Sequence, residues 1–327
     1  MVTHFKANRP YNHFLLLIYG TILAWPIFIK SISINNKRKV TLVYSGIRSM
    51  LHNIAETLPL LPTFVTILLL FIHAILLNQI ALKQRLFPKN NYLPGMTYLL
   101  FVSLFISKIQ FSDTLLASTI LLWILSKICG LQNAANSKTL LFNIGLIFGI
   151  AVLIDHPAYI FITVIWFALM LTRPFRLPEW LVVLLGGFTT YYFIGSWLFL
   201  NGKKINSLFP VLELGMPKIN LSTWELSALS FLLLIALYSI YFIHVNMRKL
   251  LVQSRNSWTI IFFYLFISIF VSFFYAVSDY NDQVFVLAPL ALISAACFFY
   301  TDQKWVVNIM HWLLVAISIV INYYYCF

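Results

Sequence analysis

The sequence predicts an all-α protein that crosses a lipid bilayer many times, and three observations support this fold class. Hydrophobic residues make up 61% of the 327 residues, and charged residues only 9%. A soluble domain carries about 25% charged residues, so most of this chain is not built to face water. The apolar residues are gathered in blocks of roughly 20 residues, the length at which a helix crosses a hydrocarbon core. Segments with the alternating polarity of membrane strands do not occur in the sequence.

Eleven apolar segments are predicted as helices of one transmembrane domain that covers residues 1–327. They are residues 14–29, 60–82, 92–106, 115–128, 140–154, 158–172, 179–200, 225–245, 258–277, 284–299 and 305–324. Several have only 15 or 16 residues, which is short for a full crossing. The pair 140–154 and 158–172 is separated only by Asp155-His156-Pro157, and it forms either two short spans or a re-entrant hairpin.

The distribution of charge predicts that the N-terminus lies in the cytoplasm. In that orientation the inner segments hold thirteen lysines and arginines and two acidic residues. The outer segments hold nine lysines and arginines and seven acidic residues. Lysine and arginine are enriched in the cytoplasmic loops of membrane proteins. The net charge of +13 is therefore explained by membrane topology, and no nucleic-acid partner is expected.

The first outer loop, residues 31–59, is expected to contain a helix that lies along the membrane surface. Four apolar residues recur there at helical spacing: Ile47, Leu51, Ile54 and Leu58. Polar residues occupy the other faces, a pattern that is typical of an interfacial helix. The second long outer loop, residues 201–223, contains prolines and glycines and is expected to be irregular.

Acidic residues gather in the predicted outer segments, where they are candidates for catalysis. The candidate catalytic residues are Glu56, Asp113, Asp155 and His156. Carboxylates that surround one cavity can bind a metal or act as a general base. The alternative is that each acid caps or solvates a helix end, as Asp113 would if it were an N-cap. For Asp155-His156-Pro157 the alternative is a tight turn in which the proline starts the next helix.

No recognisable cofactor or metal motif accompanies these residues. The three cysteines are scattered, and no spacing of cysteine and histidine matches a zinc site. Nucleotide-binding and hydrolase signatures are missing as well. A metal and a cofactor therefore remain unknown at this level.

Basic residues beside prolines mark two of the predicted inner turns. They are Lys83 and Arg85 in one turn, and Arg173 and Arg176 in the other. Lysine and arginine can hold the phosphate of a lipid headgroup by charge-assisted hydrogen bonds, so these four residues are candidate ligands of a lipid phosphate. The alternative is ordinary anchoring of cytoplasmic loops by positive charge.

Two long stretches of the sequence carry a family resemblance. LKQRLFPKNNYLPGMTYLLFVSLF begins at residue 82, and NIGLIFGIAVLIDHPAYIFITVIWFALMLTRPFRLPEW begins at residue 143. Together with the N-terminal FKANRPYNHFLLLIYG, they resemble an uncharacterised family of bacterial multi-pass membrane proteins. The resemblance implies a location in the bacterial inner membrane.

A more distant resemblance concerns the helix at 145–153, with Pro157 after it and the arginine turn at Arg173. This pattern is similar to membrane glycosyltransferases of the GT-C class. The resemblance implies a GT-C-like fold, a transferase that uses a polyprenyl-linked sugar, and membrane lipids and a polyprenyl-linked glycan as partners. Such enzymes carry a catalytic acid just after the first helix, whereas residues 31–36 here read SISINN.

Three classes of function follow from these observations. The first is a GT-C-like transferase in envelope glycan assembly, with Glu56 or Asp113 as base and Asp155 with His156 near the sugar donor. The second is a non-catalytic membrane scaffold or assembly partner, which the missing acid favours. The third is a transporter or lipid flippase, which would require charges in the middle of its helices. The predicted helices hold almost none there.

Overall fold

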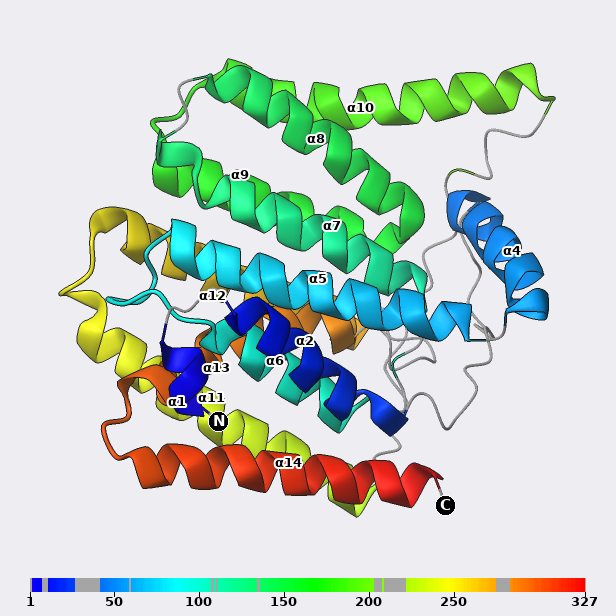
Figure 1. The fold of residues 1–327 in the computed structure, drawn as a ribbon. Coiled ribbons are helices and arrows are strands. Elements are labelled where there is room, and N and C mark those ends of the chain that lie inside the picture. The colour runs from blue at the N-terminus through cyan, green and yellow to red at the C-terminus, as the bar shows by residue number, and fades with distance from the viewer. Residues whose placement is uncertain are drawn as a thin grey trace.

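The protein is a bundle of helices that run roughly alongside one another (Figure 1). The computed structural model describes residues 2–7, 11–26, 42–58, 60–106, 109, 111–133, 136–202, 208, 222–274 and 283–326, and no strand occurs in these ranges. The α-helices are α1 (Val2–Lys6), α2 (Asn12–Leu23), α4 (Leu42–Thr57), α5 (Leu61–Lys83), α6 (Leu93–Leu104), α7 (Asp113–Ile128), α8 (Ser137–Ile154), α9 (Ile162–Thr172), α10 (Leu177–Leu200), α11 (Thr223–Met247), α12 (Val252–Phe274), α13 (Gln283–Tyr300) and α14 (Lys304–Cys326). Two short 3₁₀ helices are η1 (Leu131–Asn133) and η2 (His156–Phe161).

All eleven apolar segments predicted from the sequence are helical in the parts that the structure describes. Seven helices are long and apolar enough to cross a membrane: α5, α8, α10, α11, α12, α13 and α14. They indicate a multi-pass membrane protein. Three further apolar segments, α2, α6 and η2 with α9, are shorter. The number of eleven crossings stays a prediction, because helices of 11 to 16 residues do not reach across a bilayer by length alone.

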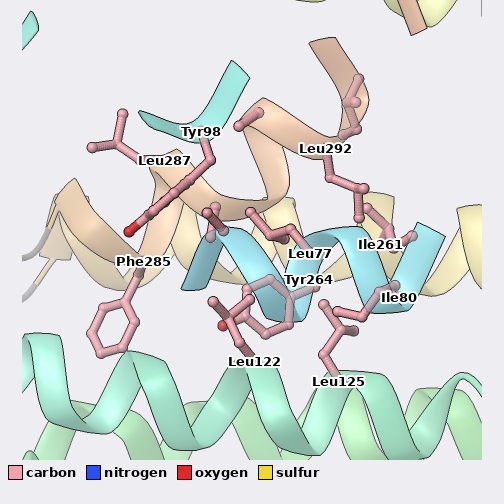
Figure 2. Close-up of a cluster of buried hydrophobic side chains, with 14 of the residues drawn as sticks. Leu77, Ile80, Tyr98, Leu122, Leu125, Ile261, Tyr264, Phe285, Leu287 and Leu292 are labelled. Carbon is pink, nitrogen blue, oxygen red and sulfur yellow. The ribbon is translucent and has the colours of Figure 1, made fainter. Parts of the chain in front are cut away.

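The centre of the bundle is formed by α6 and α13, which pack on each other. Every residue of α6 is buried, as are most residues of α13. Figure 2 shows side chains from five helices meeting here, among them Leu77 of α5, Tyr98 of α6, Leu122 of α7, Tyr264 of α12 and Phe285 of α13. Because other helices enclose α6, its twelve residues do not have to match the thickness of the hydrocarbon core.

A buried histidine connects three of the central helices. His73 of α5 places Nδ1 2.7 Å from the Tyr98 hydroxyl of α6 and Nε2 2.6 Å from Thr119 Oγ1 of α7. Thr119 donates its own hydroxyl hydrogen to the Leu115 carbonyl, so it accepts from Nε2 and the Tyr98 hydroxyl donates to Nδ1. Polar contacts of this kind hold helices together in lipid, where hydrophobic burial does not favour association.

Small residues allow α8 and α10 to pack with their backbones close together. A Cβ atom added to Gly145 would collide with the Val183 carbonyl, and one on Gly149 would lie 2.9 Å from Thr190. Thr190 Oγ1 also donates to the Leu146 carbonyl at 2.8 Å. This close pairing is typical of membrane helices. It attaches α10 to the edge of the bundle (Figure 1).

The helix predicted in the first outer loop is present as α4, and it begins earlier than predicted, at Leu42. Val43 and Ile47 pack against the bundle, whereas Ile54 and Leu58 are exposed. Its location at a membrane interface stays a prediction. Residues 31–36 and most of the second outer loop, 201–223, lie outside the described residues.

One end of the bundle collects most of the basic residues that the structure describes, and we call it the basic end. It consists of α1, the turns 84–92, 129–133, 173–176, 248–251 and 301–303, and the helix ends that flank these turns (Figure 1). Tyr92 N donates to the Phe5 carbonyl at 2.8 Å, and Lys6 Nζ donates to the Phe299 carbonyl at 2.7 Å. Burial lowers the pKa of Lys6, and nearby Asp302 opposes this shift. The grouping matches the predicted inner segments, and its location in the cytoplasm stays a prediction.

Candidate functional site

The predicted catalytic residues lie at the end of the bundle opposite the basic end (Figure 1). Asp113, the first residue of α7, is 3% exposed, and Asp155, which directly follows the neighbouring helix α8, is 1% exposed. Glu56 is exposed on α4, and His156 is partly buried in the turn after α8. Within the described residues, no three His, Cys, Asp or Glu side chains are grouped so that they could hold a metal ion.

The N-terminal end of α7 shows how the buried Asp113 carboxylate is bound. Ser112 is the N-cap, since its side chain accepts from Leu115 N at 3.2 Å. Asp113 is the first helical residue, and its Oδ1 accepts from Thr114 N at 3.0 Å. The alternative that Asp113 itself is the N-cap is therefore wrong. A carboxylate in the first turn is still stabilised by the positive end of the helix dipole.

The Asp155-His156-Pro157 sequence forms a tight turn between two helices. α8 ends at Ile154, and Pro157 lies in the first turn of η2, which continues directly into α9. The Asp155 carbonyl accepts from Ala158 N at 3.1 Å, and the His156 ring lies 5.6 Å from that of Tyr159. The geometry matches the alternative in which proline starts the next helix.

At the basic end, Arg173 is bound to the protein itself. Its Nε and Nη2 atoms donate to the Leu131 carbonyl at 3.2 and 2.9 Å, and Nη1 forms an ion pair with Glu179 Oε1 at 3.4 Å. Glu179 is buried and also accepts from Ser137 Oγ at 3.1 Å. Arg173 thus joins the turn after α7 to the start of α10, and Ser137 at the start of α8 bonds to the same Glu179. Arg176 precedes α10 as its N-cap residue, and its side chain is exposed.

Lys83 and Arg85, in contrast, line one cleft of about 720 Å³ between the end of α5 and the turn that joins α11 to α12. Its polar lining residues are Lys83, Arg85, Asn90, Asn246, Lys249 and Ser254. None of the described lining residues is acidic. Three positive charges from two distant parts of the sequence therefore face one cleft without a carboxylate among them.

The other residues that line the cleft are aliphatic or aromatic. They are Leu82, Phe87, Pro88, Leu250, Leu251 and Tyr300. Phe87 packs on the aromatic rings of Trp258 and Phe299, so this part of the lining continues into the core of the bundle. The cleft thus combines cationic and apolar lining residues at the end of membrane-length helices.

The backbone at the end of α5 positions Arg85. Leu86 N donates to the Ala81 carbonyl at 3.0 Å, and Arg85 N donates to the Leu82 carbonyl at 3.3 Å. These two bonds form a Schellman motif, in which the residue after the C-cap adopts the left-handed conformation. That residue is Arg85, with φ of 48°. Glycine usually occupies this position, because a Cβ atom makes the conformation less favourable.

Residues in the first turn of α12 form hydrogen bonds with the C-terminal end of α5. Ser254 Oγ lies 2.9 Å from both the Gln84 and the Arg85 carbonyl oxygens, and Gln253 Nε2 donates to Gln84 Oε1 at 2.9 Å. The terminal carbonyls of Gln84 and Arg85 are thus bound by a serine. The basic side chains are therefore not required for that role.

Sequence reasoning identified Lys83 and Arg85 but missed Lys249 as a member of the same site. Lys249 follows the end of α11, a region distant in sequence from α5, and the sequence marked it only as one of many inner basic residues. The pairing of Arg173 with Glu179 was also missed, although only six residues separate them in the sequence. Neither partner has a local pattern that predicts the other.

The fold and the two ends define this chain as a helical, multi-pass membrane protein with a basic cleft at one end. The chain belongs to a family of unknown function (DUF6427), whose family model matches residues 15–326. A comparison with curated proteins found no match, and a comparison with solved structures also found none.

Proposed function

We propose that this protein binds the phosphate headgroup of an anionic membrane lipid in its basic cleft. The observation that supports the proposal is the convergence of Lys83, Arg85 and Lys249 in one cleft with no acid among its described lining residues. Lysine and arginine bind phosphate through short, charge-assisted hydrogen bonds. Basic pockets between membrane helices on the cytoplasmic side are a recurrent form of headgroup site. In the predicted orientation, the cleft opens on the cytoplasmic face of the bacterial inner membrane.

The aliphatic and aromatic lining residues of the cleft favour a lipid as the occupant. Phe87, Leu250 and Leu251 would contact the first carbons of an acyl or prenyl chain while the headgroup meets the three cations. A chain in that position continues the hydrophobic surface of α5 and α11, both of which are membrane-length helices. Burial of each further CH₂ group adds about 0.8 kcal/mol to binding.

The test is a count of retained lipids. The full chain is purified in detergent after reconstitution with phosphatidylglycerol, and bound lipids are measured by native mass spectrometry. We expect the wild type to retain one tightly bound anionic lipid, and the variant with Lys83→Gln, Arg85→Gln and Lys249→Gln to lose it. Lys138→Gln is the matched control, because Lys138 is an exposed lysine in the first turn of α8, outside the cleft. Equal retention by the triple variant would contradict the proposal.

A second candidate is the polyprenyl-dependent glycosyltransferase, and the burial of two carboxylates on adjacent helices favours it. Asp113 and Asp155 are almost fully buried at one end of the bundle, and buried acids in a membrane protein are candidates for function. The test is complementation of a deletion strain. Asp113→Asn and Asp155→Asn proteins that accumulate normally should fail to restore the envelope glycan. Full restoration by both would leave the scaffold as the better alternative.

A further inference from the structure

We infer that the cleft selects lipids whose phosphate carries two or more negative charges, as in a phosphomonoester or a diphosphate, over phosphodiester lipids. The inference rests on the proposed function and specifies its ligand. It follows from the number of cations in the cleft, from the way Arg173 is bound at the same end of the bundle, and from the backbone of Arg85.

The number of charges is the first argument. A phosphodiester headgroup such as phosphatidylglycerol carries one negative charge and two unesterified oxygens. A phosphomonoester carries close to two charges at pH 7 and three strong acceptor oxygens. One arginine can satisfy the two oxygens of a diester with a single bidentate contact. The charges of Lys83 and Lys249 would then have no matching negative charge in the cleft, since no described lining residue is acidic.

Arg173 shows what this chain does where an arginine has a structural role. There, the guanidinium binds a backbone carbonyl and a buried glutamate, so its charge is compensated inside the protein. In the cleft, three cations share a space without such a carboxylate, and like charges held near one another repel. A ligand with at least two charges removes that repulsion more completely than a ligand with one.

The backbone conformation of Arg85 is a further observation, independent of the charges. The left-handed C-terminal position of a helix is occupied by glycine at the lowest free energy, yet here it carries the side chain that faces the cleft. Its carbonyl is already bound by Ser254, so the arginine is not needed to close the helix. An unfavourable backbone conformation at such a position is common at ligand-binding sites.

Hydrogen-bond donors other than the three cations add to the preference of the cleft for an anion. Asn90 and Asn246 line the cleft with side-chain amides, and Ser254 in the first turn of α12 lines it as well. The N-terminal end of a helix carries a partial positive charge, which favours an anion nearby. These groups supply contacts for oxygens beyond the two that a phosphodiester offers.

The test compares two short-chain lipids on the detergent-solubilised full chain. Dioctanoyl phosphatidic acid is the monoester probe and dioctanoyl phosphatidylglycerol is the diester probe, with affinities taken from the ligand-induced shift in melting temperature and from isothermal titration. We expect phosphatidic acid to bind about tenfold more tightly, as one further charge would provide. In Lys249→Gln the ratio should fall to roughly threefold or less, and in Lys138→Gln it should stay as in the wild type.

The outcomes separate this inference from the proposed function. Equal affinities for both lipids, each lost in the triple variant, would overturn the charge selectivity and leave lipid binding intact. Binding of both lipids that the triple variant retains would overturn the proposed function as well. Inorganic pyrophosphate is the soluble probe: if it displaced phosphatidic acid at equal concentration, the occupant would be a soluble anion and the lipid assignment would be wrong.

Discussion

Two arginines at the basic end, Arg85 and Arg173, differ in what surrounds them. Arg173 lies at the end of α9 with an extended backbone, and its guanidinium reaches the Leu131 carbonyl and the buried Glu179. Arg85 lies at the end of α5 with a left-handed backbone, beside two lysines and no described acid. The carboxylate-bound cation at Arg173 supports the fold, whereas the cations that line the cleft are the ones we propose to bind a ligand.

The two sites also differ in how they would respond to mutation. At Arg173, the guanidinium neutralises the buried Glu179 carboxylate, so loss of the Arg173 side chain should destabilise the whole bundle. At the cleft, the basic side chains face the open space and the helix end is already bound by Ser254. Changes there should alter binding and leave folding nearly unchanged. The following predictions test this contrast.

The largest effect is expected for Arg173→Ala. It should lower the free energy of unfolding by about 3 kcal/mol, because it leaves Glu179 buried without its cation and removes the bonds to Leu131. Denaturant unfolding of the purified protein in mixed micelles measures this change. Affinity for phosphatidic acid should be unaffected. A loss of less than about 1 kcal/mol, or a loss of lipid affinity in the folded variant, would break the contrast.

Glu179→Gln in the Arg173→Ala background should recover about 2 kcal/mol of that loss, since the uncompensated buried charge is removed. The amide oxygen of the introduced glutamine can still accept the hydrogen bond that Ser137 donates to Glu179. The double-mutant cycle by the same unfolding measurement gives the coupling directly. If the double variant were no more stable than Arg173→Ala, the burial of charge would not be the cause of the destabilisation.

Asn90→Asp should convert the cleft to the type of site found at Arg173, because it adds a carboxylate among the three cations. We expect affinity for phosphatidic acid to fall about tenfold, with little change in stability. The matched control is Gln303→Glu, which makes the same change of charge at an exposed position of the same end. Titration calorimetry in micelles measures both. An equal loss in the control would show that only the general charge of the surface matters.

The smallest effects are expected for Arg85→Gly, which should raise the free energy of unfolding and lower the lipid affinity. Glycine suits the left-handed position, so the free energy of unfolding should rise by about 1 kcal/mol. Affinity for phosphatidic acid should fall about fivefold, since one basic side chain near a lipid surface contributes about 1 kcal/mol. A destabilised variant would show that the Arg85 side chain supports the fold. An unchanged affinity would remove it from the site.

Much of the fold could be predicted because it depends on local composition. Each of the eleven apolar segments is a helix where it is described, and the positively charged turns do gather at one end. The number of membrane crossings was harder to predict, because α6 is apolar but short and is enclosed by other helices of the protein. The candidate site was predicted in part: Lys83 and Arg85 line one cleft, whereas Arg173 is used within the fold and Arg176 lies outside the cleft.

The sequence by itself determined that this protein is a bundle of membrane helices with one basic end. In lipid, a backbone must satisfy its own hydrogen bonds, so long apolar segments have to be helices, and this requirement is met within each segment. Only the tertiary structure decided which helices pair, that Glu179 meets Arg173, and that Lys249 joins Lys83 and Arg85. Those contacts depend on how the helices and turns pack in space, and no local sequence pattern encodes them.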